Sequence, residues 1–181
     1  ISITSSVMST EGDIGKLRLG EKYKVKEILY PLLMVSSNDA AEALARAYGR
    51  EKFIKEMNSW SNSIGAYRTY FRDPSGISSN NLSTANDMFI IAKWIKENEP
   101  EIFDITLTKA KSIRTHTWVN PTHFLNLAEY EGGKNGYTPD ANRTSLSLFS
   151  IGFPKRLYAI VLLGSEQRDT DTLTMLKEML E

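Results

Sequence analysis

Two apolar runs separated by a short polar segment place the strongest constraint on how this chain can fold. Residues 145–153 and 157–163 are rich in strand-forming side chains, and Lys155-Arg156 lies between them. Two such runs joined by a few residues are typical of an antiparallel hairpin. The sequence therefore predicts that an antiparallel sheet is part of the fold.

Apolar residues at helical spacing predict helices that mostly precede this hairpin. The expected helices cover 24–35, 40–48, 51–64, 85–97 and 169–180, and shorter strands are expected at 1–9 and 115–119. Helices and strands are segregated along the chain, which indicates the α+β class, with an antiparallel sheet packed against helices. No repeat or linker is visible, so residues 1–181 are expected to form a single domain.

Composition excludes several classes of function. Lys plus Arg total 22 and Asp plus Glu total 22, and this balance argues against a nucleic-acid partner, whose binding domains usually carry a basic excess. The chain has no cysteine, so a thiolate zinc site and a cysteine nucleophile are excluded. His116 and His123 lack the spacing of metal ligands. We expect no metal and no cofactor.

The segment Ser36-Ser37-Asn38-Asp39 lies between two predicted helices and has two interpretations. Ser, Asn and Asp are preferred helix caps, because a side-chain oxygen can accept from unpaired backbone N–H groups. Alternatively, the hydroxyl of Ser36 and the carboxamide of Asn38, two residues apart, point together into a cleft. Capping alone accounts for the residue types, and the sequence leaves both interpretations open.

The segment Gly132-Gly133-Lys134-Asn135-Gly136-Tyr137-Thr138 also has two interpretations. Asn-Gly is a strong signal for a type I′ hairpin turn, but its usual alternating apolar flanks are missing here. The alternative is a strand bordered by glycines, along which a substrate backbone could lie close. Lys134 on such a strand would present an ammonium group that holds a carboxylate.

Taken in order, these segments resemble the second and third motifs of the penicillin-recognising serine enzymes, Ser-x-Asn and Lys-Thr-Gly. Residues 32–45 resemble the helix–motif–helix segment of the low-molecular-mass D-alanyl-D-alanine carboxypeptidases. Residues 73–77 and 82–88 resemble that family's "NPxGL" and "STAxDM" segments, and residues 133–141 resemble its "GxKTGYTxxA" segment. The resemblance extends over essentially the whole chain. It implies a β-lactamase/transpeptidase-like fold and no cofactor.

The chain departs from this family's pattern in two ways. The family nucleophile lies in a Ser-x-x-Lys motif, and no serine of this sequence has a lysine three residues later. We therefore expect the chain to be the C-terminal part of such a domain, incomplete on its N-terminal side and inactive alone. Asn135 also stands where the family has Thr or Ser, which leaves substrate positioning open.

The resemblance implies a role for each motif residue. Ser36 would pass a proton to the leaving amine, Asn38 would hold the substrate amide, and Lys134 would supply positive potential. The remaining substrate contacts would come from Asn135, Gly136, Tyr137 and Thr138, with Asn135 meeting the terminal carboxylate and the Tyr137 backbone N–H serving as one oxyanion donor. In the family, a serine acyl-enzyme forms and terminal D-Ala is released from the stem peptide.

The resemblance also implies partners and a location. The substrate would be a peptidoglycan stem peptide ending in D-Ala-D-Ala, and β-lactams would inhibit the parent protein. The parent would be extracytoplasmic, although this sequence contains no signal peptide, and any membrane association would lie outside the chain. Two alternatives remain: a non-catalytic homologue that binds wall peptides or a partner, and a β-lactamase-related hydrolase.

Overall fold

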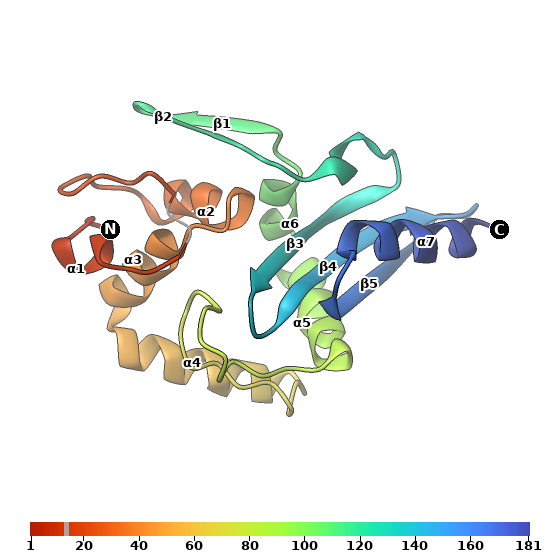
Figure 1. Ribbon diagram of the computed structural model, residues 1–181, viewed down its shortest axis with the longest axis horizontal. Coiled ribbons are helices and arrows are strands. Elements are labelled where there is room, and N and C mark those ends of the chain that lie inside the picture. Colours follow the sequence, from red (N-terminus) through yellow and green to blue (C-terminus); the bar gives the residue numbers. More distant parts are fainter. Residues whose placement is uncertain (13–14) are drawn as a thin grey trace.

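The computed structural model describes residues 1–12 and 15–181 and is a mixed α and β structure (Figure 1). Its helices lie mainly in the first two thirds of the chain. They are α1 (Ser5–Met8), α2 (Val25–Met34), α3 (Asn38–Tyr48), α4 (Arg50–Ser63), α5 (Ala85–Asn98), α6 (Glu101–Thr106), the 3₁₀ helix η1 (His123–Asn126) and α7 (Arg168–Leu180). No helix of the described part is long and apolar enough to cross a bilayer.

The strands form two antiparallel sheets. β1 (Ala110–Ile113) and β2 (His116–Val119) make a small hairpin. β3 (Tyr130–Thr138), β4 (Asn142–Ile151) and β5 (Arg156–Ser165) make a three-stranded sheet with β4 in the middle. The predicted α+β class and the predicted hairpin over 145–153 and 157–163 are therefore confirmed, the latter as β4–β5.

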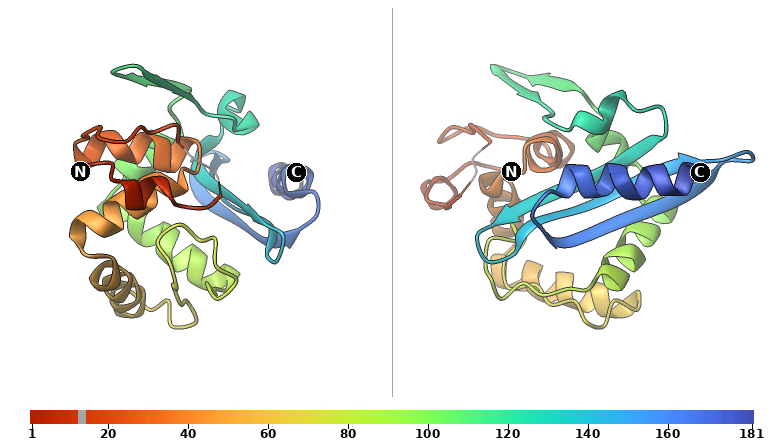
Figure 2. Two further views of the ribbon diagram at one scale, coloured as in Figure 1. Left: turned by 60° about the vertical axis from the view of Figure 1, so that its left-hand side comes forward. Right: turned by 45° about the vertical axis from the view of Figure 1, so that its right-hand side comes forward.

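Helices cover both faces of the three-stranded sheet. Leu146 of β4 packs on one face with Ala92 of α5 and Phe103 of α6. Phe149, on the opposite face, packs with Leu176 of α7, and Figure 2 shows α7 lying along this face. Phe149 is fully buried, and burying a side chain of this kind stabilises a fold by about 1.5–3 kcal/mol. Side-chain alternation along β4 thus divides the core into two layers.

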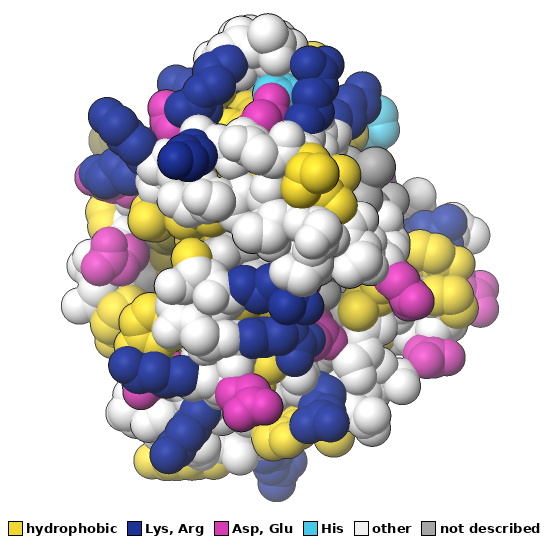
Figure 3. Space-filling model, turned by 90° about the vertical axis from the view of Figure 1, so that its left-hand side faces the viewer, with side chains coloured by type: hydrophobic (Ala, Val, Ile, Leu, Met, Phe, Trp, Pro, Cys, Tyr) yellow, Lys and Arg dark blue, Asp and Glu magenta, His cyan; other side chains and the backbone are white. Residues whose placement is uncertain are grey.

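The helices α1–α3 enclose a second core, which the β1–β2 hairpin helps to close. Ile28 and Met34 of α2, Ala40 of α3 and Trp118 of β2 belong to one buried cluster. Outside this core, Lys and Arg side chains are interspersed with Asp and Glu on the face that Figure 3 shows. That pattern agrees with the zero formal net charge of the chain.

Two sequence-based expectations were wrong. The predicted strand at 1–9 is a short helix, Ser5–Met8, preceded by a single bridge between Ser2 and Lys22. Ile3 and Val7 are both buried, and their spacing of four residues suits one face of a helix better than one face of a strand. The turn interpretation of Gly132–Thr138 is wrong as well, because these residues continue β3 to its end.

Candidate active site

Ser36 occupies an unusual backbone position between α2 and α3. Its φ is +55°, in the left-handed region that favours glycine. On either side, the backbone N–H groups of Val35 and Ser37 both donate to the Pro31 carbonyl, at 3.3 and 3.1 Å. A non-glycine residue held in this region costs on the order of 1–3 kcal/mol and is frequent at functional sites. The backbone at Ser36 is therefore an independent structural reason to examine this junction.

The neighbouring residues supply the helix cap that the sequence suggested. Ser37 is the N-cap of α3, and its hydroxyl accepts from the Ala40 backbone N–H at 3.0 Å. Asp39 is 1% exposed and accepts from the Gly15 backbone N–H at 2.8 Å. Capping by Ser37 leaves the side chain of Ser36 available for a different contact. The two interpretations of this segment thus apply to different residues within it.

Lys134 reaches this junction from the three-stranded sheet. It pairs with Leu146 across the β3–β4 ladder, so its side chain leaves the sheet on the face that carries α5 and α6. Its Nζ donates to the Ser36 hydroxyl oxygen and to the Asn135 carbonyl oxygen. Ser36 and Lys134 are 98 residues apart in sequence, and this contact joins the helical part of the molecule to the sheet.

The glycines before Lys134 serve packing inside the protein. A Cβ at Gly132 would lie 2.6 Å from Thr106 Oγ1, and the Gly133 N–H donates to the same oxygen at 3.0 Å. A Cβ at Gly133 would also meet the β4 backbone, 3.0 Å from the Ser147 Cα. These glycines therefore let α6 and β4 approach β3 closely, which is a different use from the expected approach of a substrate backbone.

Asn38 lies in the first turn of α3 and is half-buried. Its side-chain amide donates to the Glu11 carbonyl at 3.1 Å. The structure thus brings Ser36, Lys134 and Asn135 into direct contact, whereas the only hydrogen bond recorded for the Asn38 side chain, among the described residues, is to the loop after α1.

The remaining predicted site residues lie on the last part of β3. Asn135 and Tyr137 alternate with Gly136 and Thr138 on opposite faces of the strand. Tyr137 is 64% exposed, and the Arg143 guanidinium lies 5.6 Å from the centroid of its ring. The Thr138 hydroxyl accepts from the Ala141 N–H at 3.1 Å and so supports the turn into β4. Tyr137 is the most accessible aromatic group at this end of the strand.

The surroundings of His116 are structural. His116 is buried, stacks on Trp118 with ring centroids 5.6 Å apart, and its Nε2 lies 2.7 Å from Glu21 Oε1. Burial by itself would raise the pKa of Glu21, but hydrogen bonds, led by that from His116, hold this pKa below its ordinary value. Within residues 1–12 and 15–181, no group of three or more His, Asp or Glu side chains is arranged to hold a metal ion.

Sequence reasoning did not identify two residues near this junction, Gly15 and Trp118. The Gly15 carbonyl accepts from Trp118 Nε1 at 2.6 Å, across 103 residues of sequence. A tryptophan in a short strand carries no local signal for such a contact. Only the tertiary structure places Trp118 beside the loop that Asp39 binds.

Comparisons with known proteins identify the family of this chain. The D-alanyl-D-alanine carboxypeptidase family, peptidase S11, matches residues 1–165. A D-alanyl-D-alanine endopeptidase of Haemophilus influenzae is 46% identical over 122 residues, covering 64% of this chain and 42% of that protein. The carboxypeptidase DacF of Bacillus subtilis is 34% identical over 135 residues, covering 69% of this chain and 34% of that protein. The chain spans less than half of the length of these two relatives.

Solved structures show the same relationship in three dimensions. The chain matches a mutant of the Streptomyces K15 DD-transpeptidase with a TM-score of 0.88 and 25% identity, over 98% of this chain and 77% of that one. It matches a D-alanyl-D-alanine carboxypeptidase of Mycobacterium tuberculosis with a TM-score of 0.83 and 27% identity, over 90% of this chain and 64% of that one. Fold, motif order and family match together show that the chain belongs to the D-alanyl-D-alanine carboxypeptidase family, peptidase S11.

Proposed function

We propose that the protein containing this chain removes the terminal D-Ala from peptidoglycan stem peptides on the outer side of the cytoplasmic membrane. The observation that carries this proposal is the contact between Lys134 Nζ and Ser36 Oγ. It sets an ammonium and a hydroxyl side by side at the junction of helices and sheet. Such a pair can move a proton and stabilise developing negative charge.

In the proposed reaction, a serine outside this sequence attacks the carbonyl carbon of the penultimate D-Ala. The C–N bond to the terminal D-Ala breaks, and the leaving amine takes a proton through Ser36. Water then hydrolyses the acyl-enzyme. The nucleophile must come from elsewhere in the protein because no Ser-x-x-Lys occurs in these 181 residues.

The other residues would bind the substrate. Lys134 supplies positive potential for the terminal carboxylate, and Asn135 meets this carboxylate with a carboxamide N–H donor. Asn38 holds the substrate amide, which requires its side chain to exchange its bond to the Glu11 carbonyl for a bond to the ligand. The Tyr137 backbone N–H provides one oxyanion donor, and Thr138 contributes less because its hydroxyl supports the turn into β4.

The test is covalent labelling of the full-length protein with a penicillin, followed by peptide mapping. We expect one adduct, located outside residues 1–181, and none on the isolated chain. An adduct on the isolated chain would show that the assigned nucleophile is wrong. Folded full-length protein without any adduct would contradict the acyl-enzyme mechanism.

A second function, reversible binding of wall peptides without turnover, is favoured by the absence of Ser-x-x-Lys and by Asn135 in the third motif. Calorimetry with a peptide ending in D-Ala-D-Ala tests it on the 181-residue chain. A saturable heat that Lys134→Ala abolishes would support it. No detectable heat at millimolar peptide would rule it out.

A further inference from the structure

Both backbone polar groups of Gly15 are bonded to buried side chains. Its N–H donates to Asp39 Oδ1 at 2.8 Å, and the carbonyl oxygen of the same residue accepts from Trp118 Nε1 at 2.6 Å. Asp39 is 1% exposed and Trp118 is 3% exposed. Hydrogen bonds shielded from water in this way are costly to break singly, because the remaining partner is left unsatisfied. The three residues therefore form one clamp, Trp118–Gly15–Asp39.

This clamp packs directly against the segment that carries Ser36. A Cβ at Gly15 would lie 2.8 Å from the Cβ of Ser37 and 3.1 Å from the Cβ of Pro31. Only a residue without a side chain can approach so closely. The Gly15 backbone thus forms a wall against which Ser37 is fixed.

Asp39 also fixes the direction of the Ser37 hydroxyl. Asp39 Oδ1 accepts from the Ser37 hydroxyl and, at 2.9 Å, from the Ala40 N–H. The Ser37 hydroxyl oxygen in turn accepts from Ala40 N–H. Hydrogen bonds to an ionised carboxylate are about twice as strong as neutral ones. One carboxylate oxygen therefore orders the residue that follows Ser36.

Ser36 needs such support because its backbone is strained. With a φ of +55°, it would relax toward a more ordinary conformation unless its neighbours over-determine its position. The Ser37 N–H bond to Pro31 holds the backbone on one side, and the bond from the Ser37 hydroxyl to Asp39 holds the side chain. It is in this conformation that Ser36 meets Lys134.

The far end of the clamp is equally well anchored. Trp118 stacks on His116 with an interplanar angle of 11°, and His116 is bonded to Glu21. The β1–β2 hairpin is therefore attached to the segment that contains Gly15 and Glu21 at two alternate positions of β2, His116 and Trp118. This attachment gives Gly15 a rigid support.

We propose that Asp39 is a positioning residue for the Ser36–Lys134 contact, acting through Ser37, and that Gly15 and Trp118 hold Asp39 in place. The catalytic meaning of this role rests on the proposed function. The geometric role does not, since it concerns two side chains that meet without any substrate.

The test on the 181-residue chain uses two NMR signals. The Lys134 Cε resonance reports the contact with Ser36, and exchange of the Trp118 indole N–H reports the clamp. For Asp39→Ala we expect the Lys134 resonance to move toward that of a solvated lysine and the indole exchange to accelerate at least tenfold. Asp39→Asn keeps an acceptor oxygen and should stay within threefold of the parent exchange rate.

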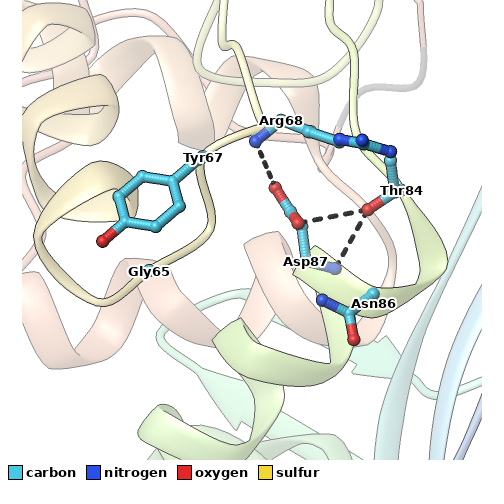
Figure 4. Close-up of a pocket in the computed structure, with 6 residues that line it drawn as sticks. All are labelled: Gly65, Tyr67, Arg68, Thr84, Asn86 and Asp87. Carbon is cyan, nitrogen blue, oxygen red and sulfur yellow. Dashed lines mark hydrogen bonds between the residues drawn. The ribbon is translucent and has the colours of Figure 1, made fainter.

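Asp87 provides a matched control. It is 4% exposed, lies in the first turn of α5, and accepts from the Arg68 backbone N–H at 2.7 Å and the Thr69 hydroxyl at 2.9 Å. Figure 4 shows it with Arg68 and Thr84, at the start of α5. Asp87→Ala should leave both signals unchanged. An unchanged Lys134 resonance in Asp39→Ala, or the same shift in Asp87→Ala, would overturn the proposal.

Trp118→Phe tests the other end of the clamp if Asp39→Ala does not fold. It keeps an aromatic ring in the core but removes the donor to Gly15. We expect a Lys134 shift of the same sign and smaller size, and no shift would overturn the proposal. In the full-length protein, penicillin acylation should slow by tenfold to a hundredfold in Asp39→Ala and recover in Asp39→Asn. A parent that never acylates refutes the proposed function, while the Lys134 signal still decides the role of Asp39.

Discussion

The helical region, residues 1–106, and the sheet region, residues 107–181, are held together by different means. All buried carboxylates among the described residues lie in the helical region: Asp39, Glu42, Asp73 and Asp87. The sheet region buries only neutral polar groups and one histidine beside its apolar core. Its order comes from the β3–β4–β5 ladder. Charge therefore organises the loops between helices, while backbone pairing organises the strands.

Asp73 shows how one carboxylate orders a loop. It accepts from the backbone N–H groups of Ser75, Gly76 and Ser78 at 2.8, 2.6 and 2.8 Å, and from the Asn81 side chain at 2.7 Å. Burial would raise the pKa of Asp73, but these hydrogen bonds outweigh it and hold the pKa below its ordinary value. Residues 73–81 contain little regular secondary structure, but these hydrogen bonds fix their conformation.

The candidate site lies where the two regions meet. Ser36 and Asn38 come from the helical region, and Lys134 and Asn135 come from the sheet region. A site built in this way depends on both kinds of order. Substitutions in each region test whether the two regions are ordered independently.

Removing the group that joins the two regions should have the largest effect. In Lys134→Ala, the full-length protein should acylate with penicillin about 10²–10³-fold more slowly, the size expected when one stabilising donor is lost from a preorganised site. Stopped-flow labelling measures this rate. Lys96→Ala is the control, because Lys96 of α5 forms a half-buried ion pair with Glu131 of β3, at 3.4 Å. Equal rates in the two variants would contradict the role of Lys134.

Asp73→Ala should loosen the helical region and leave the sheet region unchanged. Several backbone donors would lose their acceptor, and we expect a loss of about 3 kcal/mol in the local unfolding free energy, reduced where water can replace the carboxylate. Hydrogen exchange resolved by residue measures it. Protection of β4 should not change, and Asp140→Ala, at an exposed turn, should affect neither region. An equal loss of protection in β4 would show that the regions are not separately ordered.

Gly133→Ala should have the opposite pattern: it should destabilise the sheet region and leave the helical region unchanged. The added Cβ would meet the β4 backbone and lie 3.0 Å from the Tyr130 hydroxyl. Overpacking of this kind costs about 1–3 kcal/mol. Gly164→Ala in β5 is the matched control, since no atom lies within 4 Å of its Cβ and only its φ of +74° opposes the change. In thermal unfolding, the melting temperature of Gly133→Ala should be lower than that of Gly164→Ala. The reverse order would refute the close packing of β3 on β4.

Mild acid should have the smallest of these effects, and it should act on the helical region before the sheet region. A carboxyl group with a lowered folded pKa stabilises the fold fully above its ordinary pKa, about 4, and this contribution is lost as the pH falls through the folded pKa. Both Asp73 and Glu21 have lowered pKa values and lie in the helical region. We therefore expect amide signals around Asp73 to weaken below pH 4 before those of β4. Asp73→Asn should remove much of this difference, and simultaneous loss in both regions would refute it.

Periodic apolar patterns predicted the helices and strands that bury one face in the core. The helices α2 to α5 and α7 and the hairpin β4–β5 follow their apolar spacing closely. The sequence left the segment around Lys134 open between a turn and a glycine-bordered strand, and the structure confirms the strand, β3. It could not decide between them because three glycines interrupt the alternation, and the reason for these glycines, contact with Thr106 and β4, is tertiary. Nor did it reveal the short α6, which begins directly after Pro100, because six residues are too few to show a helical period.

The site was predictable to the extent that its residues lie in short motifs. Ser36 and Lys134 were found through their segments, and the structure brings them into contact. The clamp was not, because Gly15 and Trp118 meet Asp39 only through folding over long sequence distances. Local sequence can indicate candidate site residues, but it does not show what holds them in position.

The left-handed backbone at Ser36 has a consequence for how this chain responds to selection. Glycine would adopt that conformation without strain, so Ser36→Gly should raise the melting temperature while removing the hydroxyl that Lys134 contacts. Screening a library of variants for thermal stability alone would enrich glycine at position 36. If Ser36 has the role proposed above, a lineage that keeps serine there retains a less stable protein because the hydroxyl takes part in the reaction.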